Sequence, residues 1–220
     1  MIAADRRRAD PHQLAAAYLV AKSVVLKAGF APEIDHQEEC CLACAGEPEV
    51  LREGAWVILS SGMRESVVRR KFPELSAAFG HWQSAAWITR RIATCKRRAL
   101  AVFAHVGKID AILELARRVH RFGIEEVLRQ VSNQGIVYLQ TFPFMGPATA
   151  CHFAKNLGLD VVKPDRHLMR VSKAAGFDTA WDLCNTIGEV VGERRSVIDL
   201  VIWRYATIRH DYVKLFTPPL

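Results

Sequence analysis

A tight turn between two helical segments is the sequence feature that most constrains this chain. The first segment ends near Leu139, the turn runs from Pro143 to Gly146, and Pro147 follows it directly. Proline is favoured at the first position of a helix, where its missing N–H would have no partner. The sequence therefore predicts a helix–hairpin–helix over residues 136–156.

The start of the second helix of this hairpin has the properties of an anion site. The first N–H groups of a helix have no partner in the helix and carry the positive end of its dipole. A glycine before them lets the backbone approach another surface closely, which suits a phosphate. The same residues also fit a plain helix–helix turn plugged by apolar side chains, so the hairpin alone leaves both interpretations open.

A candidate functional carboxylate follows the hairpin. Asp165 lies 19 residues after Gly146 (165 − 146) and directly before the amphipathic run that begins at Leu168. This position predicts a helix N-cap, because an Asp side chain accepts hydrogen bonds from the first N–H groups. A cap and a functional carboxylate are both compatible with the pattern.

The hairpin, Gly146 and Asp165 together resemble the signature of the helix-hairpin-helix, Gly/Pro-Asp superfamily of DNA glycosylases, typified by endonuclease III. The resemblance implies an all-α fold of two lobes, with about ten helices and an active-site cleft between the lobes. It implies that Asp165 is catalytic and that the hairpin holds the DNA backbone. The backbone-binding residues would then be Phe144, Met145, Gly146, Ala148 and Thr149.

Two residues depart from the pattern of that superfamily. Its hairpin usually reads Leu-Pro-Gly-Val-Gly, and Phe144 replaces the first glycine here, which is closer to the hairpin of 3-methyladenine DNA glycosylase I. Ala148 stands where bifunctional members place a nucleophilic Lys. Without an amine at that position no Schiff base can form there, so the resemblance implies a monofunctional hydrolase.

A second stretch resembles the same family. Residues 57–75 match a family segment that carries a wedge residue and ends in a Pro-containing loop, here around Pro73. The wedge position corresponds to Gly62, so a wedge would have to come from Met63 or Arg64. Glu38 is a further candidate, because 3-methyladenine glycosylase I recognises its base with a Glu of the N-terminal segment. The other candidates for the pocket are Trp56, Tyr138 and Lys163, although aromatic residues at helical spacing are usually core.

The charge of the chain favours a polyanionic partner. Its formal net charge is +7 and its pI is near 9.3, although the basic pairs are dispersed as on ordinary solvated helix faces. With the resemblance, this predicts double-stranded DNA containing a modified base as the partner of a monomer. No apolar run has the ~20 residues of a membrane span and no secretory signal is recognisable, so a cytoplasmic location without membrane contact is expected.

Six cysteines are present and are expected to stay reduced. Cys40, Cys41 and Cys44 supply three clustered thiols, one short of a closed zinc site, and no second Cys-x-x-Cys follows. No metal site is predicted from them. The four-Cys loop of many endonuclease III relatives has no counterpart after Cys184, so no iron–sulfur cluster and no other cofactor are expected.

The remaining periodicity is helical throughout, with no convincing strand. Helices are predicted at 11–29, 33–45, 49–60, 108–122, 124–131, 179–191 and 194–212, with two more between 82 and 105. By analogy with the family, residues 50–140 would form a six-helix lobe. Residues 1–49 would pack with a second lobe made of 141–220, which contains the hairpin and the Asp165 helix.

Three functions compete at this level. The first is a monofunctional glycosylase that uses Asp165 in base-excision repair of damaged or modified DNA. The second is a bifunctional glycosylase and lyase with an amine from elsewhere, such as Lys155 or Lys163. The third is a non-catalytic DNA-binding module in which Asp165 is only a cap.

Overall fold

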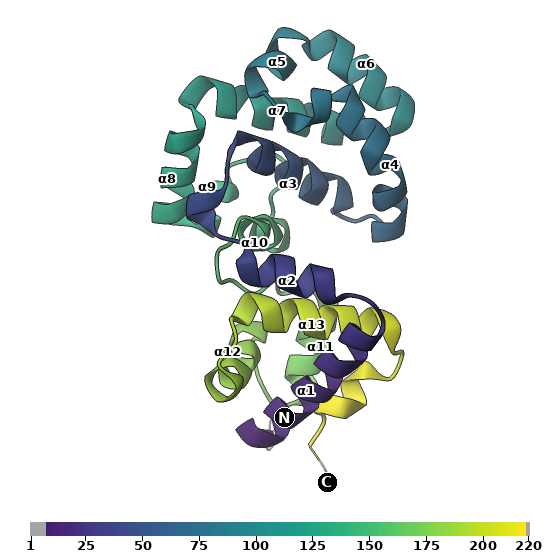
Figure 1. Cartoon of the computed structure of the whole chain (residues 1–220), viewed down its shortest axis with the longest axis vertical. Helices are drawn as coiled ribbons and strands as arrows, with labels where there is room; N and C mark the ends of the chain where they lie inside the picture. The colour runs from purple at the N-terminus through teal and green to yellow at the C-terminus, as the bar shows by residue number, and fades with distance from the viewer. Residues whose placement is uncertain (1–7, 219–220) are drawn as a thin grey trace, which may run out of the picture. The chain divides into compact units, whose positions relative to one another are not determined.

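The computed structural model describes residues 8–218, and all regular structure in this range is helical (Figure 1). The prediction of an all-α protein is confirmed. The chain forms two compact units, which we call unit 1 (Met1–Cys40 with Asp160–Leu220) and unit 2 (Cys41–Leu159). Sequence analysis placed the divisions after residues 49 and 140, whereas the contacts divide the chain after residues 40 and 159.

Unit 1 is built around α13, which packs against α1, α2, α11 and α12. Its core contains Tyr18, Leu168 and Ile198, each without solvent exposure. Leucine, isoleucine and valine at helical spacing supply these buried faces, and their removal from water stabilises the unit. Its helices are α1 (Pro11–Lys27), α2 (Ala31–Glu39), α11 (Arg166–Ala174), α12 (Ala180–Val191), α13 (Arg195–Ile208) and the 3-10 helix η3 (Tyr212–Phe216).

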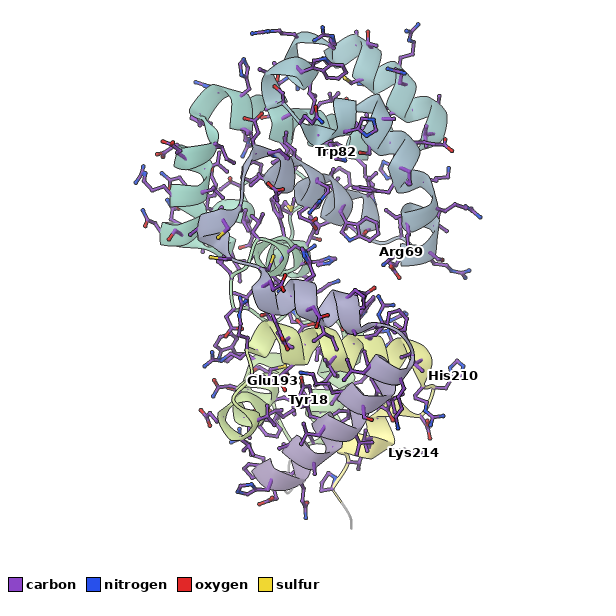
Figure 2. The ribbon with its side chains drawn as sticks, viewed as in Figure 1. Tyr18, Arg69, Trp82, Glu193, His210 and Lys214 are labelled. Atoms are coloured by element: carbon purple, nitrogen blue, oxygen red, sulfur yellow. The ribbon has the colours of Figure 1, made fainter. Side chains whose placement is uncertain are left out.

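A polar contact crosses this core at α1. The Tyr18 hydroxyl donates to Glu193 Oε2 at 2.5 Å, and the two side chains point toward each other in Figure 2. Lys22 Nζ lies 3.0 Å from the same carboxylate oxygen. Burial, with the neighbouring Glu193 carboxylate, raises the pKa of Tyr18, so the phenol stays protonated and donates. The contact ties the first helix of the chain to the segment before α13.

Unit 2 is built around α7, which packs against α3, α5, α6 and α8. One side of α7 is fully buried, including Ile109, Ala116 and Val119. The helices of this unit are α3 (Glu47–Ser60), α4 (Glu65–Ala78), α5 (Ala85–Arg90), α6 (Ile92–Val102), α7 (Val106–Phe122), α8 (Ile124–Gln134), α9 (Ile136–Leu139) and α10 (Pro147–Asn156), with the 3-10 helices η1 (Leu42–Cys44) and η2 (Gly80–Trp82).

Residues 8–218 contain thirteen α-helices, so the predicted number of about ten is too low. The helix predicted at 33–45 is also too long, because α2 ends at Glu39. Arg194 Nη1 donates to the carbonyl oxygens of Gln37 (3.2 Å), Glu38 (3.3 Å) and Cys40 (3.0 Å). Because this guanidinium takes the last carbonyls of α2, the chain leaves the helix there and continues as the separate turn η1.

The prediction of a Pro-containing loop around Pro73 is wrong, since α4 continues through this residue to Ala78. Pro73 removes one backbone N–H from the helix and normally breaks it. Here the proline lies on an exposed face of α4, while Val68 and Leu75 of the same helix are fully buried. The packing of that apolar face keeps the helix in place.

In the part of the chain that the structure describes, no single helix has the length and apolar composition of a membrane span. The bent pair α1 and α2, which meet at 116°, passes that test only when taken together.

Candidate functional site

The predicted hairpin is present in unit 2 as the turn between α9 and α10. Its backbone is held by Phe142 N–H to Leu139 O at 3.1 Å and Met145 N–H to Phe142 O at 3.2 Å. The Phe142 and Met145 side chains are buried, each 3% exposed. These two apolar residues anchor the turn, which leaves the residues between and after them at the surface.

Phe144 has a left-handed backbone, with φ of 62°. A residue with a Cβ pays roughly 1–2 kcal/mol for this conformation, which glycine adopts freely. The ring packs edge-on against His105, with centroids 5.9 Å apart, and a Cβ on Gly107 would lie only 3.2 Å from its Cζ. The departure from glycine at position 144 therefore gives the hairpin a side chain that rests on the start of α7.

Gly146 is the N-cap of α10, and neither its backbone conformation nor a close contact within the chain requires a glycine there. Its φ is −65°, which any residue can adopt, and a Cβ at this position would meet nothing within 4 Å. No side chain caps the helix, and its first bond joins Ala150 N–H to Gly146 O at 2.8 Å. The N–H groups of Ala148 and Thr149 therefore have no partner within α10.

The predicted wedge loop lies between α3 and α4. Gly62 has φ of 67°, Met63 is 40% exposed and Arg64 is the exposed N-cap of α4. Met63 and Arg64 are therefore both accessible to a partner.

Lys108, which sequence analysis missed, holds this loop. Its Nζ donates to Leu59 O at 2.6 Å and to Ser61 O at 2.5 Å, and only 3% of the residue is exposed. Burial lowers the pKa of this amine. Since Phe144 packs on Gly107 in the same turn of α7, the start of α7 contacts both the hairpin and the wedge loop.

Asp165 lies in unit 1 and is the N-cap of α11, as predicted. Its Oδ1 accepts from His167 N–H at 2.8 Å and from Leu168 N–H at 3.0 Å. No described residue bonds its Oδ2, and the side chain is half-buried. The carboxylate is thus fixed through one oxygen while the other remains available.

The segment that leads to Asp165 is fastened to α13 at two points. Asp160 accepts from Ser196 N–H at 2.9 Å and pairs with Arg195 Nη1 at 2.9 Å. Further on, Lys163 N–H donates to Oδ2 of Asp199, a carboxylate that is only 1% exposed. These bonds fix the position of Asp165 before α11 begins.

His167 adjoins Asp165 and has a defined tautomer. Arg166 Nε donates to its Nε2 at 3.2 Å, so the proton of the neutral ring is on Nδ1 and points to the Tyr212 hydroxyl at 3.1 Å. Burial lowers the pKa of His167, and the nearby Asp165 carboxylate opposes this effect. His167 is therefore neutral at pH 7.

The other predicted site residues are distributed over both units. Glu38 of unit 1 pairs with Lys22 at 3.4 Å and is about half exposed. Trp56 of unit 2 is half-buried and packs edge-on against Phe72, with ring centroids 5.2 Å apart. Tyr138 packs in the same way against Phe142, at 5.5 Å, and Lys163 is half-buried. Trp82 of unit 2 is a core residue, 2% exposed.

The cysteines divide into two groups. Cys41 and Cys44 are exposed, and their hydrogen bond raises the pKa of the Cys44 thiol, while Cys95, Cys151 and Cys184 are buried. Among the described residues no three His, Cys, Asp or Glu side chains are grouped as metal ligands.

The net charge of the protein is concentrated in one unit. Unit 2 contains 16 Lys and Arg against nine Asp and Glu, which is +7, whereas unit 1 contains 14 of each kind. The unit that holds the hairpin and the wedge loop therefore carries the whole excess of positive charge. This concentration favours a polyanion at unit 2.

Comparison of the chain with protein-family models, with curated proteins and with solved structures gave no match.

The Lys108 clamp predicts a specific loss of stability. Lys108→Met should lower the free energy of unfolding by about 1–3 kcal/mol, because the carbonyls of Leu59 and Ser61 lose their buried donor. Lys96→Met is the control, since Lys96 makes only an exposed ion pair with Asp110 and should cost less than about 1 kcal/mol. Denaturant unfolding followed by circular dichroism measures both. Equal losses in the two variants would contradict the clamp.

His167 predicts a pH dependence of stability. Because its pKa in the folded state lies below its ordinary value of about 6.5, the unfolded chain binds more protons between these two values. Stability should therefore fall as the pH is lowered from about 6.5 through the folded-state pKa. His167→Gln should reduce this fall, and the exposed His210→Gln should leave it unchanged in denaturant titrations at several pH values. The hypothesis fails if both variants keep the wild-type slope.

Proposed function

We propose that this protein is a monofunctional DNA glycosylase of the two-lobed helix-hairpin-helix type. It would bind duplex DNA, extrude a damaged or modified base and hydrolyse the N-glycosidic bond. The observation that carries the proposal is the uncapped start of α10, offered by a glycine with open space around it. A phosphate is the ligand that such a helix end favours.

The charge of unit 2 supports the same partner. An excess of seven positive charges attracts DNA from a distance and is independent of its sequence. The hairpin amides would then fix the backbone, with Met63 or Arg64 entering the space left by the extruded base. Contacts of this kind recognise the shape of the backbone and leave the choice of base to the pocket.

The proposed chemistry assigns the reaction to Asp165. Positive charge develops on the sugar as the base leaves, and a fixed carboxylate stabilises this transition state or positions a water. The oxygen Oδ2, which no described residue bonds, would face the sugar, while Oδ1 keeps the side chain in place.

The lyase alternative has weaker support. Ala148 offers no amine at the family position, and Lys155 is buried, 5% exposed. Lys163 is half-buried and its backbone N–H is bound by Asp199, which leaves it as the remaining candidate amine. Strand cleavage without added alkali would favour this alternative. Release of a base without strand cleavage supports the monofunctional enzyme, and a protein that only binds duplexes would be a non-catalytic module.

The substrate is first identified by incubating the purified protein with duplexes that each carry one alkylated, oxidised or deaminated base. We expect release of at least one of these bases. The duplex that reacts fastest then serves in the tests of single residues.

The hairpin predicts a change in DNA affinity that does not depend on the lesion. Gly146→Val should weaken the binding of every duplex by about tenfold, because its side chain would keep the phosphate from the α10 amides. The control is Asn133→Val, at an exposed residue of α8. It adds the same side chain elsewhere in unit 2 and should leave the affinity for DNA unchanged. Fluorescence anisotropy at fixed salt measures both. A folded Gly146→Val protein with wild-type affinity would remove the hairpin from the interface.

Asp165→Asn separates the cap from the chemistry. Asn still caps a helix, so stability should fall by no more than about 1 kcal/mol, whereas base release should fall by two or more orders of magnitude, or about 3 kcal/mol. The control is Asp10→Asn, because Asp10 caps α1 in the same way, through Oδ1 to His12 N–H (3.0 Å) and Gln13 N–H (3.1 Å).

Single-turnover excision and thermal unfolding are measured for both variants. Wild-type excision by Asp165→Asn would reduce Asp165 to a helix cap. Glu38 would then be the next carboxylate to test.

A further inference from the structure

Unit 2 contains a concavity of about 550 Å³ that the proposed function does not use. It lies between the second half of α7 and the residues from α9 to the start of the hairpin. Three arginines of α7 line it, Arg117, Arg118 and Arg121, together with the aromatic side chains of Phe122 and Tyr138.

Arg118 is held rigidly in the wall of this concavity. Its Nη1 donates to Thr141 O at 2.9 Å and to Thr141 Oγ1 at 3.1 Å, and its Nε donates to Glu114 at 3.2 Å. The guanidinium also lies over the Phe142 ring, 4.6 Å from its centroid. Since Phe142 and Thr141 belong to the turn between α9 and α10, Arg118 ties the concavity to the base of the hairpin.

Arg117 and Arg121 are exposed and stand one turn apart on the same face of α7. Like charges at this spacing repel each other, and Arg118 adds a third charge to the group. Glu114 is the one carboxylate of the lining, and it reaches Arg117 only at 3.5 Å. Among the described residues Arg121 has no ion pair, and its guanidinium lies 5.3 Å from the Phe122 ring. The position of these residues near the C-terminus of α7 offsets part of the repulsion.

The aromatic residues add a second kind of recognition. Phe122 is 51% exposed, so its ring is accessible to a ligand in the concavity. Tyr138 is half-buried, and no described residue hydrogen-bonds its hydroxyl. Burial raises the pKa of this phenol, so it remains a neutral donor. A flat ring and a phosphate together match this combination of aromatic and guanidinium groups.

We propose that this concavity binds a nucleotide, with its phosphate at Arg117 and Arg121 and its base against Phe122. The nucleotide is either free or one unit of a single-stranded nucleic acid, whose unstacked bases can reach aromatic side chains. An acidic peptide would use the arginines but not the exposed ring. The site requires neither Asp165 nor the α10 amides, so it stands or falls independently of the proposed glycosylase.

The test compares two variants that lose the same charge. Arg117→Gln/Arg121→Gln removes the two exposed guanidinium groups of the concavity. Arg97→Gln/Arg98→Gln removes two exposed arginines of α6 in the same unit, which form no ion pair with any residue of 8–218. The probe is a short fluorescein-labelled oligothymidylate, with binding followed by anisotropy at fixed salt. We expect a loss of about tenfold in the first variant and about twofold in the second.

Further arms distinguish base from phosphate and strand from free nucleotide. Phe122→Ala should weaken oligothymidylate binding by about five- to tenfold and leave the competition by inorganic phosphate unchanged. Competition by thymidine monophosphate at the wild-type concavity assigns the site to a free nucleotide, and competition by unlabelled oligomer alone assigns it to a strand. If the double variant does not fold, Arg121→Gln alone is used, because it breaks no ion pair. It should also weaken oligothymidylate binding.

Equal losses in the two double variants would overturn the site, because binding would then follow net charge alone. Wild-type binding by folded Arg117→Gln/Arg121→Gln or Phe122→Ala would overturn it as well. Excision by the same variants on the best duplex is measured at saturating protein. If a variant loses oligothymidylate binding but retains excision, this site is separate from the proposed active site. If the wild-type protein shows no excision at all, the binding result still stands.

Discussion

This structure depends on hydrogen-bond partners for the backbone N–H and carbonyl groups at its helix ends. Each helix leaves N–H groups at one end and carbonyls at the other, and a chain of many short helices has many such ends. Asp10 and Asp165 cap N-termini from adjacent positions, whereas Lys108 and Arg194 bond C-terminal carbonyls of α3 and α2 from far along the chain. The two cations thereby determine which segments lie together. The start of α10, beside the hairpin, is one of several helix N-termini in residues 8–218 that no side chain caps.

This distinction explains which parts of the fold could be predicted from the sequence. The cap at Asp165 and the start of α10 at Pro147 depend on neighbouring residues, and both could be predicted from the sequence. The clamp by Lys108 depends on carbonyls about fifty residues away, and a single lysine in a helical pattern gives no sign of it. The helix through Pro73 likewise depends on packing that local propensity does not contain.

Local signals also determined how much of the candidate site could be predicted. Gly146, Met63 and Asp165 were identified from spacing and resemblance, and each is at least partly accessible. The left-handed backbone of Phe144 could not be read from its residue type, since phenylalanine rarely adopts it, and its partner His105 lies on another helix end. The arginine concavity was missed because Arg117, Arg118 and Arg121 belong to one helix and such a group of basic residues usually marks a solvated face.

The division of charge adds a physical argument to the proposed function. If the seven excess positive charges were spread evenly over the chain, both units would attract DNA. The negative charge of a carboxylate would then oppose that attraction wherever it lay. Instead unit 2 carries the excess and unit 1 has equal numbers of both signs. Long-range attraction and the candidate carboxylate are thereby assigned to different units. Within unit 1, however, Lys163, Arg166 and Arg170 lie close to Asp165 along the chain, so the local surroundings of this carboxylate are cationic.

Asp165 and Asp10 make the same cap, and the comparison shows what a cap alone requires. The two N–H bonds to Oδ1 are nearly identical in the two places, at 2.8 and 3.0 Å for Asp165 and at 3.0 and 3.1 Å for Asp10. The segment before Asp165 is fastened by two carboxylates, Asp160 and Asp199, of which Asp199 is almost fully buried. Burial of a carboxylate costs several kcal/mol unless its partners compensate for the lost water. The carboxylates of Asp160 and Asp199 thus hold the backbone that leads to Asp165 in one position, and a fixed position is what the proposed contact of its second oxygen with a substrate would require.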